Sequence, residues 1–162
     1  MTIEVIKPGL LTTVQDKGRF GLQQFGVIVS GAMDTLSYQI GNLLLQQEDQ
    51  ASLEMTFLGP TLTFHCETMI AITGADMEPT LNGIPCPIWR AIPIKSGDTL
   101  KFPSAKKGVR SYLAVKDGIQ VEQVLTSRST FLKAELGGFQ GRTDYCGRGC
   151  RFRFSCRANS PC

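Results

Sequence analysis

The fold class follows from residues 52–66, which read SLEMTFLGPTLTFHC. Apolar residues at Leu53, Met55 and Phe57 alternate with polar ones, and this two-residue period is typical of a strand with one buried face. Gly59-Pro60 then marks a turn, and the alternation resumes beyond it. The sequence therefore predicts two short strands joined by a tight turn.

Further short strands flank this pair on both sides. Asn82-Gly83 is a two-residue hairpin signal, because both positions tolerate a positive φ angle. Ser96-Gly97-Asp98 predicts a second turn between two strands. The expected strands cover residues 3–6, 69–72, 92–94, 99–102 and 110–115.

One segment has the period of a helix instead. Asp34 precedes it and is placed to accept hydrogen bonds from the free amides of its first turn. Gly41 within it would allow close packing on a sheet. Its apolar residues share one helical face, which consists of Met33, Leu36, Ile40, Leu43 and Leu44. Many short strands with one amphipathic helix predict a mainly β fold, either a barrel or a sandwich with a covering helix.

Charge and cysteines are unevenly distributed along the 162 residues. Residues 1–142 hold 13 basic and 13 acidic residues, so the net charge of +3 comes from residues 143–162, which also contain four of the six cysteines. The cysteine spacing there lacks the paired units of a zinc site, and the arginines lack companion lysines. We therefore expect no metal site and no nucleic-acid partner. No apolar run is long enough for a membrane span. His65, the single histidine, has no cluster of partner residues around it in the sequence, which disfavours a Ser-His-Asp triad.

Polar residues gather in loops at the ends of the predicted strands, where a rigid scaffold can support a site. The alternative for each loop is purely structural, since Asp and Ser cap, Gly turns and Arg packs. The loops are Gln15-Asp16 with Arg19, and residues 30–34, 73–76, 127–130 and 138–142.

These loops together resemble the biotin-dependent carboxyltransferase/allophanate hydrolase subunit 2 family, from about Ile3 to Arg142. The family includes the C subunit of ATP-dependent 5-oxoprolinase, the KipA-type antagonist of a sporulation kinase inhibitor, and part of the carboxyltransferase domain of urea carboxylase. The motifs that carry the resemblance are PGLLTTVQD (8–16), GR (18–19), SGAMD (30–34), LGP (58–60), TGAD (73–76), NG (82–83), GD (97–98), YLAV (112–115), SRST (127–130) and GG (137–138).

The resemblance implies a cyclophilin-like β-barrel and a role as one subunit of an ATP-dependent 5-oxoprolinase-type enzyme in the cytoplasm. The implied partners are a second cyclophilin-like subunit, of the 5-oxoprolinase B type or KipI-like, and a third subunit of the lactam-utilisation type. No motif for ATP is readable, so ATP would be bound by the assembled complex. Two alternatives stay open, a KipA-type regulator that binds a kinase inhibitor, and a carboxyltransferase that uses carboxybiotin and acts on urea.

The substrates implied by the resemblance are small amides, which offer N–H donors and a carbonyl acceptor. At the matching positions we expect three catalytic residues: Asp34 and Asp76 as acceptors from N–H, and Arg128 as a holder of negative charge. The structural alternative, a helix cap at Asp34 and a turn at Asp76, stays open. We expect substrate binding by Arg19, Ser30, Met33, Asn82 and Ser129.

The resemblance is lost from Thr143 onwards. Family members run to roughly twice this length, so we interpret residues 1–142 as the N-terminal part of a cyclophilin-like subunit. Residues 143–162 are an Arg/Cys-rich tail, which we expect to be disordered and to reflect a frameshift or premature end of the reading frame. A family-like continuation in another reading frame would test this.

Overall fold

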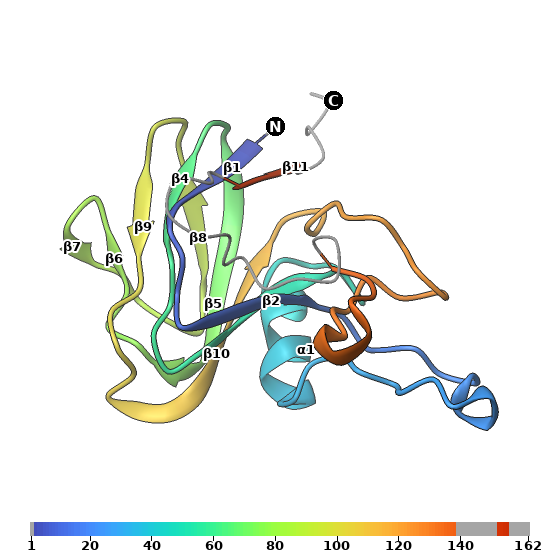
Figure 1. The fold of residues 1–162 in the computed structure, drawn as a ribbon. Helices are drawn as coiled ribbons and strands as arrows, with labels where there is room; N and C mark the ends of the chain where they lie inside the picture. The colour runs from blue at the N-terminus through green and yellow to red at the C-terminus, as the bar shows by residue number, and fades with distance from the viewer. Residues whose placement is uncertain (1, 139–151, 156–162) are drawn as a thin grey trace.

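The computed structural model describes residues 2–138 and 152–155, which form two antiparallel sheets and one α-helix (Figure 1). The first sheet contains β1 (Thr2–Lys7), β4 (Thr61–Phe64), β6 (Thr80–Leu81), β7 (Ile84–Pro85), β9 (Thr99–Lys101) and β11 (Phe152–Ser155). The second sheet contains β2 (Leu11–Gln15), β3 (Ser52–Thr56), β5 (Thr68–Asp76), β8 (Ala91–Ile94) and β10 (Lys107–Val115). The helix is α1 (Thr35–Leu44), and two short 3-10 helices are η1 (Gln23–Phe25) and η2 (Leu132–Ala134).

The strands are arranged β11-β1-β4-β9-β6-β7 in the first sheet and β2-β3-β10-β5-β8 in the second. One apolar core draws on both sheets, because alternate residues of each strand point inward. Its fully buried members include Ile3, Leu62, Phe64 and Leu100 from the first sheet and Leu53, Met55, Ile70, Ile72 and Leu113 from the second. The mainly β architecture expected from the sequence is confirmed.

The alternation of apolar and polar residues that was predicted for residues 52–57 continues to Thr56 and then stops. Leu53 and Met55 are buried as predicted, but Phe57 is half exposed. The chain leaves the strand there, since Phe57 has a φ of 64° and its amide bonds to the carbonyl of Val109 at 2.8 Å. The expectation that Phe57 shares the buried face is therefore wrong.

Both predicted turns are present. Asn82 and Gly83 have φ angles of 53° and 83° and connect β6 to β7, as a two-residue hairpin requires. The turn at residues 96–98 is closed by a 2.8 Å hydrogen bond from the amide of Lys95 to the carboxylate of Asp98. It joins β8 of the second sheet to β9 of the first, so it carries the chain from one sheet to the other.

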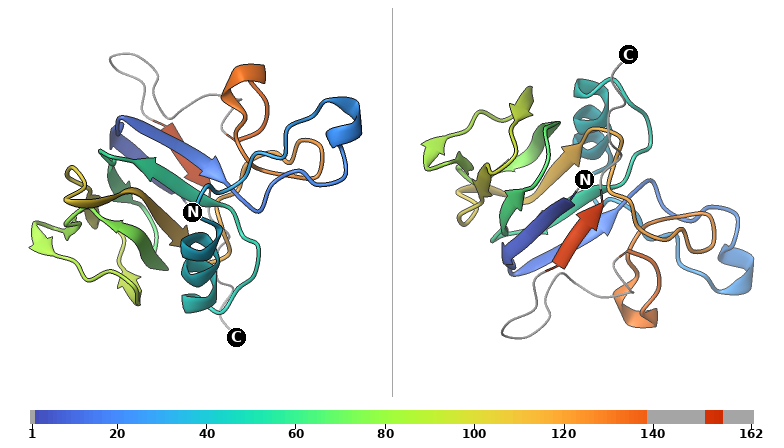
Figure 2. Two further views of the ribbon diagram at one scale, coloured as in Figure 1. Left: turned by 90° about the horizontal axis from the view of Figure 1, so that it is seen from below. Right: turned by 90° about the horizontal axis from the view of Figure 1, so that it is seen from above.

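Helix α1 begins after Asp34 as predicted, and it packs against β5 and β10 on the outer face of the second sheet (Figures 1 and 2). Gly41 lies over this sheet, where a Cβ atom would stand 3.2 Å from Thr73 Oγ1 and 3.4 Å from Ala114 Cβ. The buried residues of the helix are Ser37, Tyr38, Gly41 and Asn42.

Three of the five apolar residues expected on one face of the helix point away from the sheet, whereas Leu44 is partly buried against Leu45, Ala71 and Ala114. Met33, Leu36 and Leu43 are 72%, 65% and 63% exposed. The reason is the polar and small-residue surface below, where Thr73 Oγ1 donates to the carbonyl of Ser37 at 2.7 Å. A stripe of large apolar side chains cannot approach such a surface as closely as Gly41 does. The face of the helix that the sheet buries therefore carries small and polar residues together with the Tyr38 ring.

The segment beyond Arg142 contributes one described element. Residues Phe152–Ser155 form β11, which pairs antiparallel with β1. Disorder was expected for residues 143–162; the free edge of β1 allows this backbone pairing, and the rest of that segment lies outside the described residues. The tail cysteines lie outside the described residues. No helix in the described part of the chain is long and apolar enough to cross a membrane.

Candidate functional site

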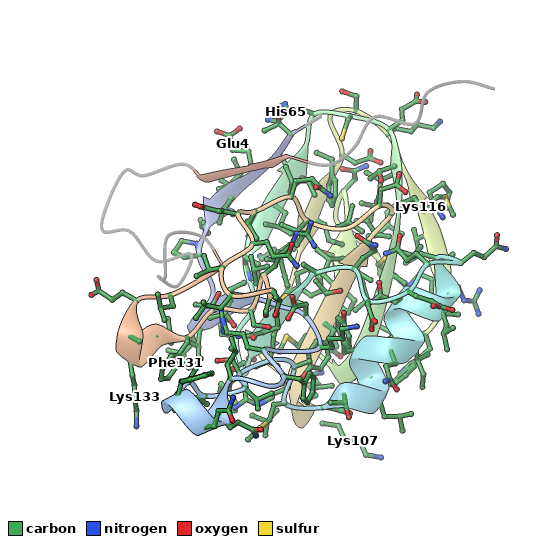
Figure 3. The ribbon with its side chains drawn as sticks, turned by 90° about the vertical axis from the view of Figure 1, so that its right-hand side faces the viewer. Glu4, His65, Lys107, Lys116, Phe131 and Lys133 are labelled. Atoms are coloured by element: carbon green, nitrogen blue, oxygen red, sulfur yellow. The ribbon has the colours of Figure 1, made fainter. Side chains whose placement is uncertain are left out.

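A pocket of about 540 Å³ lies on the outer side of the second sheet, where α1 begins. Asp34 and Ser37 come from the start of the helix, and Asp76 comes from the end of β5. Lys107 and Arg110 come from β10, which pairs with β5, and Trp89 also lines the space. We call this space the Asp34–Asp76 pocket. Figure 3 shows Lys107 at the start of β10, beside α1.

Glu54 organises the floor beneath this pocket. This buried carboxylate accepts a 2.6 Å hydrogen bond from Arg110 Nη1 through Oε1. Its Oε2 accepts from the Tyr112 hydroxyl at 2.8 Å and from the amide of Met33 at 2.9 Å. The Tyr112 hydroxyl in turn accepts from the amide of Asp34 at 2.8 Å. One carboxylate thereby fixes both the Arg110 guanidinium and the entry of the chain into α1.

Tyr112 keeps its proton in this network. Burial raises the pKa of Tyr112 well above its ordinary value, and the nearby charge of Glu54 raises it further. The hydrogen bond from the amide of Asp34 lowers the pKa, but by less than burial raises it. Tyr112 is therefore a neutral donor to Glu54 and not a base.

Asp34 caps the helix and also lines the pocket. Its carboxylate accepts from the Ser37 amide at 3.0 Å and from the Ser37 hydroxyl at 2.5 Å. These hydrogen bonds, first that of the hydroxyl and then that of the amide, hold the pKa of Asp34 below its usual value. Asp76 is exposed, and its Oδ1 accepts from the amide of Glu78 at 2.8 Å. Both carboxylates thus have the local role of the structural alternative, and both also line the pocket.

A second polar group lies where the chain after β2 meets residues 124–138. We call it the Asp16 cluster, and it consists of Asp16, Arg19, Ser127, Arg128 and Ser129. Asp16 is buried and accepts hydrogen bonds from the hydroxyls of Ser127 and Ser129 and from the amides of Arg128 and Gly18. Burial alone would raise the pKa of Asp16, but these four hydrogen bonds outweigh it and lower the pKa.

Arg19 is completely buried in this cluster. Its Nε donates to the carbonyl of Val124 at 3.2 Å, and its Nη2 donates to the carbonyl of Ser129. Nη1 finds no hydrogen-bond partner among the described residues. Burial lowers the pKa of the Arg19 guanidinium, and the negative charge of Asp16 opposes that shift. The side chain fastens residues 124–129 to the chain that follows β2 and does not line the Asp34–Asp76 pocket.

Residues 30–34 connect the two sites. The amide of Ala32 bonds to the carbonyl of Asp16 at 2.9 Å, and the next amide, that of Met33, bonds to Glu54. Ser30 has a φ of 55° at the start of this connection. Figures 1 and 2 show the loop after β2 and the segment before η2 extending together from one side of the sheets.

The eight residues expected at a site therefore fall into separate groups. Asp34 and Asp76 share one pocket, and Arg19, Arg128 and Ser129 share the Asp16 cluster. Ser30 and Met33 lie on the connection, and the side chain of Met33 points to solvent. Asn82 lies in the β6–β7 turn, where its amide nitrogen donates to Asp98 at 2.8 Å and its oxygen accepts from the amide of Thr99 at 2.9 Å. Asn82 belongs to neither group.

Sequence reasoning did not single out Glu54, Lys107, Arg110 or Trp89. Glu54 was recognisable only as a polar position on a strand, and it becomes informative once β3 pairs with β10 and places it opposite Tyr112. Over residues 2–138 and 152–155, no group of three or more His, Cys, Asp or Glu residues is arranged to hold a metal ion.

Comparison with known families decides how this chain is classified. The family model for the carboxyltransferase domain, subdomain A and B, matches residues 25–147. The chain belongs to this carboxyltransferase domain family. The match includes both walls of the Asp34–Asp76 pocket and residues 127–129 of the Asp16 cluster. It confirms the resemblance drawn from the ordered motifs.

Relatives within the carboxyltransferase domain family include enzymes of two kinds. Urea amidolyase of Saccharomyces cerevisiae is 39% identical over 142 residues, which are 86% of this chain and 8% of that protein. The C subunit of the Escherichia coli 5-oxoprolinase is 39% identical over 143 residues, which are 86% of this chain and 46% of that subunit. The matched part of this chain thus covers less than half the length of either relative.

A solved structure confirms the fold of the family. The urea carboxylase of Kluyveromyces lactis superposes with a TM-score of 0.86 and 40% sequence identity. The similarity covers 88% of this chain and 13% of that protein.

Proposed function

We propose that this chain supplies a substrate pocket to an ATP-dependent enzyme of the 5-oxoprolinase type, which opens a small lactam and acts with a second cyclophilin-like subunit. The observation that carries the proposal is the placement of opposite charges around one pocket, with Asp34 and Asp76 on one part of the wall and Lys107 and Arg110 on another. The 39% identity with the C subunit of a 5-oxoprolinase supports it.

An amide suits this arrangement. Its N–H groups need an acceptor, which the exposed carboxylate of Asp76 provides, and its carbonyl oxygen gains negative charge when the amide carbon is attacked. A positive charge beside the pocket, from Lys107 or Arg110, stabilises such a charge. Trp89 adds a flat apolar surface for a planar group.

The start of α1 does not suit ATP. A helix N-terminus binds phosphate through its free amides, but here the Ser37 amide already bonds to Asp34, and the carboxylate of that cap repels an anion. In the proposed enzyme, ATP is therefore bound by other parts of the complex. Its partners are the second cyclophilin-like subunit and a lactam-utilisation subunit.

Carboxyl transfer to urea is the second candidate function. The similarity to urea amidolyase and to the urea carboxylase structure favours it. In that case Lys107 and Arg110 are the cations that would hold the carboxylate of carboxybiotin, the group that supplies the carboxyl to be transferred.

Reconstitution with the partner subunits tests the proposal. We expect 5-oxoproline-dependent ATP hydrolysis with release of glutamate, and we expect Asp76→Asn to lower kcat/KM by about tenfold or more, because it loses a charged acceptor in the pocket. Asp49→Asn, which changes an exposed aspartate paired with Lys17, is the control and leaves the rate unchanged. Urea-dependent carboxylation without glutamate release would favour the second candidate, and stable binding of the partner without turnover of either substrate would contradict both.

A further inference from the structure

We infer that the Lys107 and Arg110 side of the Asp34–Asp76 pocket binds the carboxylate of a substrate that carries an amide N–H and a carboxylate on the same small molecule. This inference rests on the proposed function and narrows its substrate class. Urea has no carboxylate, so with urea this side of the pocket would need the carboxylate of a second molecule, such as carboxybiotin.

The donors of Arg110 are fixed but only partly used. Both of its hydrogen bonds to described residues leave from Nη1, at 2.6 Å to Glu54 and 3.1 Å to Thr56. Nη2 and Nε therefore keep their donors for a ligand, and the side chain is 29% exposed. A guanidinium with one edge anchored and another edge free can bind a carboxylate through two parallel hydrogen bonds.

Lys107 provides a second positive charge on the same side. Its side chain is exposed, and no ion pair holds it within the described part of the chain. The neighbouring Lys106 differs in this respect, because its ammonium pairs with Glu78 at 2.7 Å. Lys107 also lines the pocket, whereas Lys106 does not. The charge of Lys107 is therefore available to the pocket, whereas the charge of its neighbour Lys106 is already paired with Glu78 at the surface.

The backbone of β10 brings these cations to the pocket. Lys107 pairs with Asp76 of β5, and the next register pair is Ser111 with Gly74, so β10 has two more residues than β5 in this interval. Such a bulge bends a strand and re-aims its side chains, and bulges are common beside active sites. Gly74 permits it, since a Cβ atom there would stand 2.5 Å from the carbonyl oxygen of Arg110.

The carboxylate of Asp76 supplies the acceptor that the N–H of such a substrate needs. Asp76 stands opposite Lys107 in the strand register, so the pocket has an acceptor for N–H on one strand and cations for a carboxylate on the next. A neutral amide would satisfy Asp76 but would bring no carboxylate to the cations. A molecule such as 5-oxoproline, with a lactam N–H next to a carboxylate, satisfies both.

The experiment compares two lactams that differ only in the carboxylate. Binding of 5-oxoproline and of 2-pyrrolidinone to the 162-residue chain is followed by chemical-shift titration of the backbone amides. We expect 5-oxoproline to bind about tenfold more tightly or better, the difference expected for charge-assisted hydrogen bonds. Urea is titrated in parallel and is expected to bind no better than 2-pyrrolidinone.

Three variants test whether the pocket residues cause the tighter binding of 5-oxoproline. Arg110→Gln should abolish it, and Lys107→Gln should weaken 5-oxoproline binding about two- to fivefold while leaving 2-pyrrolidinone unaffected. Lys106→Gln removes the same charge one residue away and should change neither affinity. Because loss of Arg110 leaves Glu54 without its cation, the Lys107→Gln result decides the matter if Arg110→Gln does not fold.

Equal affinity for the two lactams, no detectable binding of 5-oxoproline at millimolar concentration, or equal effects of Lys107→Gln and Lys106→Gln would each overturn the inference. These outcomes are independent of turnover. An assembled enzyme that releases no glutamate would refute the proposed function, while the carboxylate preference of the pocket would still stand or fall on the titrations.

Discussion

Glu54 and Arg110, which are 56 residues apart in the sequence, are joined by a 2.6 Å hydrogen bond between a buried carboxylate and a guanidinium. The same carboxylate accepts from the Tyr112 hydroxyl and from the amide of Met33. Three residues, two on β10 and one just before α1, therefore depend on one side chain. The floor of the pocket and the start of α1 should weaken together when it is removed.

Replacing Glu54 by Ala should lower the free energy of unfolding by about 3–5 kcal/mol, because it leaves a partly buried guanidinium and a buried hydroxyl without their acceptor. Glu54→Gln retains one acceptor oxygen and should cost less, about 1–3 kcal/mol. Urea denaturation followed by fluorescence measures both. The exposed Glu67 serves as the control, since Glu67→Gln should have no measurable effect. A stability loss below about 1 kcal/mol for Glu54→Ala would contradict the network.

The second prediction concerns Asp16 and acid. Its hydrogen bonds lower the pKa in the folded state below the ordinary value of 3.8. A carboxyl group with a depressed folded-state pKa stabilises the protein at pH values above its unfolded pKa, and this contribution is lost as the pH falls through the folded pKa. The stability supplied by Asp16 should therefore be constant near neutral pH and should decrease below about pH 4.

Asp16→Asn isolates this contribution from those of Asp34 and Asp98, whose pKa values are shifted in the same direction. At neutral pH the variant should lose about 1–3 kcal/mol, because an amide presents donors where two hydroxyls and two amides donate. The difference between wild type and variant should then shrink as the pH is lowered from about 5 to about 3. A difference that stays constant over this range would show that the charge of Asp16 is unimportant.

The third prediction separates the two roles of Asp34. Asp34→Ala removes the helix cap and should cost about 0.5–2 kcal/mol, whereas Asp34→Ser keeps a capping oxygen and should cost only a few tenths. Both variants remove the carboxylate from the pocket. Thermal unfolding measures the cap, and lactam titration measures the pocket. If the two variants are equally destabilised, the contact between Asp34 and Ser37 is not the source of the stability.

The fourth prediction tests the orientation of α1. Leu43→Gln changes an exposed residue and should alter the free energy of unfolding by less than about 0.5 kcal/mol. Tyr38→Ala removes a buried ring on the opposite face and should cost about 3–5 kcal/mol. Chemical denaturation of the two variants provides the measurement. The reverse order of effects would mean that the apolar stripe of the helix faces the sheet.

The local features of this fold could be predicted from the sequence. The alternation around Leu53 and Met55, the hairpin at Asn82-Gly83 and the cap at Asp34 depend on neighbouring residues only, and the structure contains all three. Strand β2 was not predicted, because residues on both of its faces are buried and its sequence Leu-Thr-Thr-Val-Gln lacks clear alternation. Periodicity detects a strand with one covered face, and it fails when both faces are covered.

The candidate site could be predicted from the sequence only in part. Asp34 and Asp76 could be proposed from their loops, but their shared pocket depends on the packing of α1 on β5. Glu54 and Arg110 lie on strands whose register no local pattern specifies, and the bulge that brings Arg110 to the pocket is a property of two paired strands. The orientation of α1 likewise depends on the surface beneath it, which exists only after the second sheet has assembled.

The hydrogen bond between the Asp16 amide and the Ser129 hydroxyl closes a loop of 113 residues. Closing such a long loop costs conformational entropy during folding. Proteins that are rich in contacts between residues far apart in the sequence fold slowly. The β5–β10 and β3–β10 pairings join shorter separations and can form first. We therefore expect the Asp16 cluster to close late in folding, after synthesis has passed residue 129, so that variants in it accelerate unfolding more than they slow folding.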